Sequence, residues 1–273
     1  MAERVLNVTD GAHSPLGPSS SKRWIKCPGS VQATAHLPST TSEFAIEGTA
    51  AHAVAEECET LGVRADHFLD WTIRVNKDGA STDVLCTQEM VDGVNAFLDY
   101  CDDWSGESFN ETLVHYETWV PDGFGTMDRA KVDGHTAHII DFKYGKGVQV
   151  YAADNEQLKL YALGFIEDFG WLFPDLETFV LHIVQPRLDH AESWTIARSD
   201  LLAWAEDVVA PAALRTSNSK APFAAGDWCQ FCKIRSTCMV RASSVFETVV
   251  GDFEDLDAAI ETPVPTVAAL SND

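Results

Sequence analysis

Asp128, Asp141 and Lys143 are the residues whose types and spacing most directly indicate chemistry. Mg²⁺ or Mn²⁺ takes oxygen ligands such as paired carboxylates and keeps several waters, one of which it can acidify. A lysine beside such an ion can stabilise charge on a phosphate or help position the attacking water. The three residues therefore predict phosphodiester hydrolysis. Taken alone, they are equally compatible with the ordinary polar face of a hairpin.

The strands that must position these residues flank Asp133-Gly134. This pair separates two runs of β-forming residues, 126–132 and 135–143, and an Asp-Gly pair in that setting predicts a two-residue hairpin loop. With that loop, Asp128 lies opposite Ile139. Because side chains alternate along a strand, Asp128, Asp141 and Lys143 project from one face of the hairpin.

A helix follows the hairpin, and Asp154 is its predicted N-cap. Apolar residues recur along it at helical spacing. Gln157 and Tyr161 stand four residues apart and so reach the same side of the helix. By themselves such residues are more typical of a helix surface and a helix core than of a catalytic site.

Three segments, 125–128, 139–143 and 157–161, together resemble the P-D-(D/E)-X-K nucleases, specifically the RecB-like branch that includes recombination helicase-nuclease domains and CRISPR adaptation exonucleases. The resemblance implies a restriction-endonuclease-like α/β fold with a mixed central sheet flanked by helices. It also implies that Asp128 and Asp141 bind the catalytic metal. Met127 departs from the family by standing where a proline can occur. The resemblance further implies catalytic roles for Lys143, Gln157 and Tyr161, the last two orienting DNA.

Residues 43–61 read as a helix that carries Glu-Gly-Thr-Ala-Ala-His, from Glu47 to His52. A lone histidine on a helix is usually a surface or core residue. The RecB-like branch, however, carries G-T-x-x-H before its acids, and by that resemblance His52 joins Asp128 and Asp141 as a metal ligand. Glu47 is five residues away, about 140° around the helix, and so orders the helix start or faces substrate.

A second constellation is formed by cysteines. Cys229, Cys232 and Cys238 lie within ten residues, a metal-ligand pattern that needs a fourth ligand, for which Cys27 is the candidate. Thiolates suit either Zn²⁺ or an iron-sulfur cluster, and spacing does not choose between them. The iron-sulfur members of the RecB-like branch show the same pattern, which implies a 4Fe-4S cluster that ties the two ends of the domain together.

Two further regions carry cations that could meet DNA. Lys22 and Arg23 lie beside Trp24 in a basic stretch that could hold phosphates and stack a base, or could form a short amphipathic helix. Arg187 follows a predicted strand, 178–185, and is a candidate contact to the DNA backbone.

The bulk composition of the 273 residues is that of a globular protein, with 45% hydrophobic and 22% charged residues. Nineteen cations against 42 acids give a net charge of -23, which disfavours a binder that relies on a general positive field. No membrane-span or signal pattern is present, so we expect a cytoplasmic protein, in the host cytoplasm if phage-encoded.

These observations predict a flexible lead-in over 1–20, a RecB-like domain over 21–242 and an acidic, disordered tail over 243–273. The predicted function is a metal-dependent exonuclease acting on linear DNA ends for phage recombination or replication, beside a single-strand annealing protein and without a membrane partner. The oligomeric state stays open. The alternative is a non-catalytic DNA-end-binding or assembly module with a structural iron-sulfur or zinc site.

Overall fold

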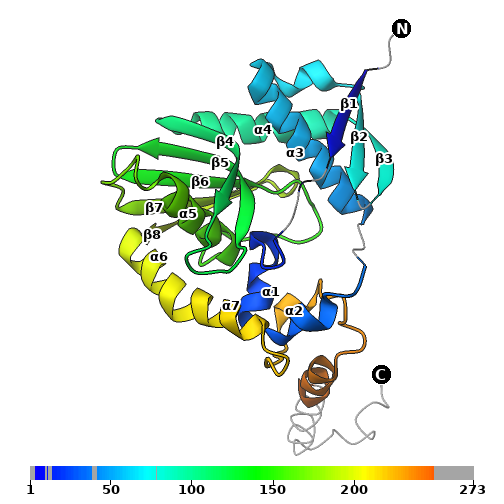
Figure 1. Cartoon of the computed structure of the whole chain (residues 1–273). Coiled ribbons are helices and arrows are strands. Elements are labelled where there is room, and N and C mark those ends of the chain that lie inside the picture. The colour runs from blue at the N-terminus through cyan, green and yellow to red at the C-terminus, as the bar shows by residue number, and fades with distance from the viewer. Residues whose placement is uncertain (1–3, 10, 12–13, 39–41, 78, 249–273) are drawn as a thin grey trace, which may run out of the picture.

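The fold was analysed in a computed structural model, which describes residues 4–9, 11, 14–38, 42–77 and 79–248. Its centre is a five-stranded sheet in the order β4-β5-β6-β7-β8 (Figure 1). Neighbouring strands are antiparallel except for β6 and β7, which are parallel because a helix crosses over between them. The prediction of a mixed sheet with flanking helices is therefore confirmed. The strands are β4 (Glu107–His115), β5 (Phe124–Asp133), β6 (Thr136–Phe142), β7 (Thr178–Gln185) and β8 (His190–Ala197).

The hairpin of β5 and β6 differs from the predicted register. Asp133 pairs with Thr136, so the loop is Gly134-His135, and Gly134 supplies the positive φ of +59°. Asp133 stays in the strand, where its carboxylate accepts a hydrogen bond from Ser105. The shift moves each pairing by two positions, and an even shift leaves every side chain on its predicted face.

Two hydrophobic clusters cover the two faces of the sheet, because successive residues of β6 point in opposite directions. Ile139 packs in one cluster with α5, while Ile140 and Phe142 pack in the other with α3 and α4. Figure 1 shows α5 on one face and α3 with α4 on the other. The helices are α3 (Glu43–Leu61), α4 (Gln88–Asp102), α5 (Glu156–Phe169), α6 (Arg198–Trp204) and α7 (Ala210–Thr216), the last two joined by a π-helical turn, Ala205–Val209.

A smaller sheet corrects the prediction that residues 1–20 form a flexible lead-in. Strand β1 (Val5–Thr9) pairs in parallel with β2 (Thr72–Lys77), which pairs antiparallel with β3 (Ala80–Leu85). Leu6 and Val8 of β1 alternate with polar residues and pack against the cluster under α3. That alternation is a short strand pattern, and it orders part of the expected lead-in.

Residues 14–38 and 215–241, which we call the cysteine lobe, lie side by side at the lower end of the molecule in Figure 1. The lobe contains α1 (Ser21–Lys26) and α2 (Gly29–Thr34). Gln32 donates to the Thr216 carbonyl at 3.0 Å, and the Gly29 amide donates to the Pro222 carbonyl at 3.0 Å. The two segments of the cysteine lobe are thus joined by direct hydrogen bonds.

Of the predicted acidic tail, residues 243–248 are helical, and the remainder lies outside the described residues. None of the helices in the described part of the chain combines the length and apolar character that crossing a membrane requires.

Candidate metal centre at the sheet fork

The candidate site lies where β5 and β6 stop pairing. The last pair of the ladder is Arg129 with Ile140. One step further, the carboxylate of Asp128 accepts a hydrogen bond from the Phe142 backbone N–H at 2.6 Å, taking the place of a backbone acceptor. Asp128 and Asp141 are both buried at this fork. The hairpin therefore holds the two predicted acids next to each other, away from bulk water.

His52 reaches the fork from α3. Ser42 begins this helix by accepting a hydrogen bond from the Ala45 N–H, and the apolar side of the helix packs on the sheet cluster that contains Phe142. The His52 ring lies 5.1 Å from the Phe142 ring, between centroids. Its Nδ1 atom is 3.3 Å from an Asp128 carboxylate oxygen. His52 therefore lies beside Asp128, and its role as a metal ligand stays a prediction.

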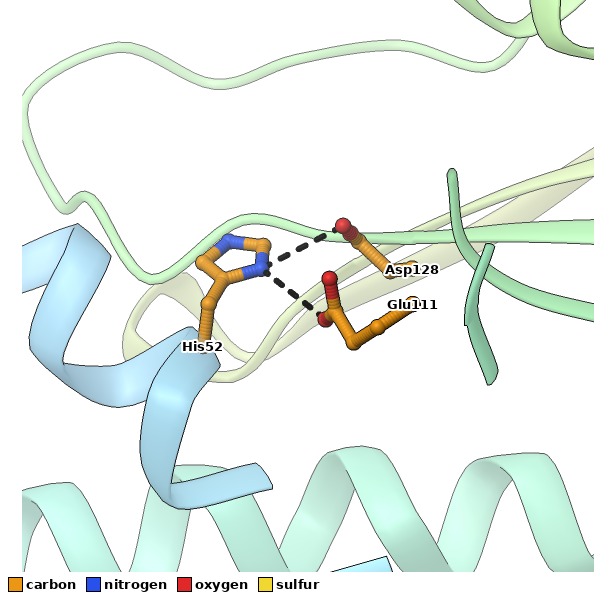
Figure 2. A group of neighbouring side chains, drawn as sticks. All are labelled: His52, Glu111 and Asp128. Atoms are coloured by element: carbon orange, nitrogen blue, oxygen red, sulfur yellow. Dashed lines mark ion pairs between the residues drawn. The ribbon is translucent and has the colours of Figure 1, made fainter. Parts of the chain in front are cut away.

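Glu111 is the third residue of the group and was not among the predicted site residues. Its carboxylate oxygen lies 3.9 Å from the Nδ1 of His52, and Figure 2 shows both carboxylates directed at the imidazole. One ligand atom from each of His52, Glu111 and Asp128 lies within 4.8 Å of the others. Asp141, the third ligand that the resemblance implied, stands outside this group.

Backbone geometry explains how Glu111 enters the site. Along β4 and β5 the pairing passes from Asn110 with Arg129 to Thr112 with Met127 and omits the residues between, Glu111 and Asp128. Glu111 has a φ of +40°, an unusual value for a non-glycine residue inside a strand. The local interruption turns its side chain towards the fork.

The pKa values of His52, Glu111 and Asp128 depend on two opposing effects, the burial of each group and the charges of its neighbours. Burial raises the pKa of Glu111 to about 7, with the Asp128 charge adding to the effect and His52 opposing it. Burial would also raise the pKa of Asp128, but His52, Lys143 and the Phe142 N–H together lower it. Burial would lower the pKa of His52, and the two carboxylates instead raise it well above its usual range. The imidazolium thus offsets part of the negative charge.

Asp141 belongs to a second chain of contacts on the α5 side of the fork. One of its oxygens accepts a hydrogen bond from the Gln157 amide at 2.9 Å, and the other lies 2.7 Å from the Lys143 ammonium. Gln157 also accepts from Lys143 at 3.1 Å and donates to the Tyr161 hydroxyl at 3.1 Å. Burial raises the pKa of Asp141 to about 6, against the opposing charge of Lys143. The structure therefore brings together all four residues that the sequence analysis named on this side.

Asn155, rather than the predicted Asp154, caps α5. The Asn155 side chain accepts hydrogen bonds from the N–H groups of Gln157 and Leu158. Asp154 instead has a φ of +52° and pairs with the buried ammonium of Lys159. The correction moves the helix start by one residue and leaves Gln157 and Tyr161 on the face that meets the fork.

Arg187 does not face outward, as a contact to the DNA backbone requires. Its side chain is 5% exposed, donates to Glu47 at 2.8 Å and meets Glu89 through two hydrogen bonds of 3.0 and 3.1 Å. The guanidinium also lies over the Tyr144 ring, 4.5 Å from its centroid. Arg187 thus ties the start of α3 to α4 and to the loop after β6. Glu47 supports the helix that carries His52, one of its two predicted roles.

The four predicted cysteines meet in one cavity of the cysteine lobe. Cys27, Cys229, Cys232 and Cys238 all line it. The Cys27 sulfur accepts a hydrogen bond from the Ala224 N–H at 3.3 Å. Among the described residues, no three cysteine sulfurs lie within 4.8 Å of one another.

The two basic residues singled out near Trp24 have different surroundings. Arg23 lines the cysteine cavity, and its buried Nε has no hydrogen-bond partner in the described part of the chain. Lys22 forms an exposed ion pair with Asp227 across the lobe. Trp24 is fully buried in the main core and is closed to base stacking, which excludes that part of the prediction.

Comparison with known proteins gives a family and two distant fold matches. A family model described as protein of unknown function, DUF2800, matches residues 13–270. The protein in the crystal structure of SSO0001 has 16% sequence identity with this chain, and the match has a TM-score of 0.34 and covers 88% of each chain. A protein of Eubacterium rectale named "putative exonuclease" is 12% identical, with a TM-score of 0.42, covering 81% of this chain and 86% of that one. At these TM-scores neither structure bears on the chemistry of the site.

Proposed function

This chain belongs to DUF2800, a family of proteins of unknown function, and within it we propose that the protein is a metal-dependent deoxyribonuclease that hydrolyses phosphodiester bonds at DNA ends. The observation that carries the proposal is the fork itself. Three carboxylates, those of Glu111, Asp128 and Asp141, converge there, and within the described part of the chain His52 and Lys143 are the cationic groups that contact them. A buried acidic surplus of this kind is stabilised by a cation.

The donor atoms fit a divalent metal with a preference for oxygen. His52, Glu111 and Asp128 would hold it, and Asp141 is the nearest further carboxylate along the hairpin. Carboxylates favour Mg²⁺ and Mn²⁺, and the imidazole adds a preference for Mn²⁺. When bound, such an ion supplies a Lewis acid and a water of lowered pKa.

The remaining residues supply charge and orientation. Lys143 is partly exposed, and its ammonium can approach the scissile phosphate while Asp141 and Gln157 hold it in place. Tyr161 is buried and hydrogen-bonded to Gln157, so it fixes the rotamer of that amide. Preorganised donors of this kind stabilise charge that develops in a transition state.

We propose a 4Fe-4S cluster for the cysteine cavity. Cys27, Cys229, Cys232 and Cys238 line one cavity, and four thiolates would suit either zinc or a 4Fe-4S cluster. The cysteine spacing shared with the iron-sulfur RecB-like nucleases favours the cluster. Anaerobic protein should contain iron rather than zinc and absorb near about 400 nm.

The experiment that tests the nuclease proposal uses end-labelled linear DNA and closed circular DNA, with Mn²⁺, Mg²⁺ or EDTA. Anaerobically prepared protein is compared with Asp141→Asn and with Asp175→Asn, a control that removes an exposed acid remote from the fork. We expect cleavage of linear DNA alone, lost in EDTA and in Asp141→Asn and retained in Asp175→Asn. The retained label then gives the direction of digestion.

Two other outcomes separate the alternatives. Cleavage of circular DNA would establish an endonuclease at the same site. No cleavage with any metal, by protein that still holds its iron and binds DNA ends, would contradict the nuclease proposal and favour the non-catalytic end-binding module.

A further inference from the structure

The charge of this protein is segregated. The cysteine lobe makes up about a fifth of the chain, yet it holds eight of the 19 lysines and arginines and one of the 42 acidic residues. It therefore carries a net charge of +7, against -30 for the rest. The overall charge of -23 conceals a strongly basic region at one end of an acidic molecule.

The cations of the lobe also differ from the others in how they are paired. Outside the lobe, carboxylates hold most lysines and arginines in ion pairs, as at Arg64, Arg129, Lys143, Lys146, Lys159 and Arg187. Among the described residues of the lobe, Lys22 is the one cation that pairs with a carboxylate, that of Asp227. The single acid of the lobe cannot neutralise its seven other cations.

These cations fall into two groups by position. Arg23, Arg235 and Arg241 line the cysteine cavity. Lys26, Arg215, Lys220 and Lys233 are exposed and do not line the cavity. Lys233 donates only to the Leu37 carbonyl across the lobe, at 3.2 Å. The exposed group is therefore available to an external polyanion.

The cysteine lobe packs against α5, the helix that carries Gln157 and Tyr161. The short turn Pro18–Ser20 precedes α1 and packs beside Gly125, the first residue of the segment that leads to Asp128. A Cβ built on Gly125 would lie 2.5 Å from Pro18 and 3.2 Å from the Tyr161 ring. Leu16 also accepts a hydrogen bond from Tyr116 at 3.1 Å. The absence of a side chain at Gly125 lets the lobe approach Tyr161 closely.

We propose that the exposed cations of the cysteine lobe form the surface on which the DNA strand enters, and that the lobe directs the strand along α5 towards the fork. Choosing DNA among polyanions rests on the proposed nuclease function. The lobe also exposes Phe231, whose side chain can stack on a base of a single strand. The acidic surface elsewhere repels DNA and confines it to the lobe.

The test measures DNA binding without cleavage. Iron-containing protein in EDTA is titrated into a fluorescein-labelled single-stranded oligonucleotide and its duplex, over a range of salt concentrations. The variant Lys26→Gln/Lys220→Gln/Lys233→Gln is compared with Arg64→Gln/Arg74→Gln/Arg198→Gln, which removes the same charge outside the lobe. We expect the lobe variant to bind DNA at least about tenfold more weakly at low salt. The slope of the logarithm of its affinity against the logarithm of the salt concentration should be shallower by about 2. The affinity of the control should change less than about threefold.

Equal binding by the wild-type protein and the lobe variant overturns the inference, as does equal weakening by the control. Vesicles of phosphatidylserine are titrated in parallel. If the lobe variant loses vesicle binding and keeps DNA binding, the surface is for membranes and the inference is again wrong. The proposed function is judged separately. A wild-type protein that binds DNA through these cations without cleaving it leaves the inference standing and overturns the nuclease.

Discussion

The fork and the cysteine lobe gather charged residues in opposite ways. At the fork, side chains from α3, β4, β5 and β6 bring carboxylates together in a buried place, where each is paired or hydrogen-bonded. In the lobe, two segments from distant parts of the chain expose cations that have little acidic counterpart. The first arrangement suits a metal ion, and the second suits a polyanion. A net charge averaged over the chain describes neither region.

If the cysteine lobe and the fork bind their metals independently, removing two cavity cysteines should abolish iron binding in the lobe and leave metal binding at the fork unchanged. In Cys229→Ser/Cys232→Ser we expect loss of the iron and protease cleavage between 215 and 241, because ligand loss removes the bonds that hold this segment. Mn²⁺ binding at the fork should persist. The control Cys58→Ala/Cys86→Ala replaces two buried cysteines outside the cavity and should keep its iron. Loss of Mn²⁺ binding together with the iron would contradict the separation.

Within the fork, Lys143 should affect catalysis and not metal binding. In Lys143→Met we expect cleavage to fall by about 10²–10³-fold, the usual effect of removing one preorganised charged donor, with Mn²⁺ affinity unchanged or higher. Lys146→Met, three residues along the same loop, removes an exposed pair with Glu89 and should change the rate only a few-fold. Single-turnover rates and Mn²⁺ titrations measure the two effects separately. Equal rates for the two variants would remove Lys143 from the chemistry.

The ion pairs of the buried Arg187 side chain should contribute more to stability than a pair between two exposed side chains. Arg187→Met leaves Glu47 and Glu89 without their partner, and because both acids are partly exposed we expect a loss of about 1–3 kcal/mol in the free energy of unfolding. Arg64→Gln breaks an exposed pair with Asp99 and should cost less than about 1 kcal/mol. Denaturant unfolding measures both. Similar costs would show that Arg187 does not hold α3 to its neighbours.

The sheet should also be sensitive to acid through a histidine pair away from the fork. His182 Nε2 lies 3.0 Å from His138 Nδ1, and Tyr100 contacts the other nitrogen of His182 at 2.9 Å. Burial, followed by the charge of His138, lowers the pKa of His182 to about 3. Between about pH 6.5 and 3 the unfolded chain therefore binds a proton that the folded chain excludes, and stability falls as pH falls.

From pH 7 to pH 5 we expect this one group to cost about 1–2 kcal/mol, measured as the free energy of unfolding at each pH. His182→Asn cannot take up the proton, so its free energy of unfolding should fall less between pH 7 and pH 5 than that of the wild type, by the same amount. An unchanged pH dependence in His182→Asn would contradict the assignment.

The sequence predicted residues that interact along one element or across one hairpin. The register of the hairpin was wrong by two residues, and an even error leaves each strand side chain on its predicted face. The predicted residues on the hairpin and on the following helix therefore still meet: Asp141, Lys143, Gln157 and Tyr161. Strand β7 was predicted with its observed bounds, because mostly apolar residues lie there before the turn at Pro186.

What the sequence did not predict depends on contacts between distant elements or on backbone geometry. Glu111 enters the fork through a positive φ and an interrupted pairing, and neither has a signature in residue type. Arg187 follows a strand like many surface cations, and its burial depends on where Glu47 and Glu89 come together. The charge segregation could have been read from the sequence, but only once the two segments of the lobe were known to be neighbours.

The most direct test of the metal centre is a calorimetric titration of Mn²⁺ into the iron-containing wild-type protein, Glu111→Gln and Glu107→Gln, an exposed glutamate on the same strand. If His52, Glu111 and Asp128 form the site, Glu111→Gln should weaken Mn²⁺ by about 10–100-fold or more, while Glu107→Gln binds as the wild type does. Wild-type affinity in Glu111→Gln, with binding lost in Asp141→Asn, would contradict this ligand set and restore the one that the sequence alone implied.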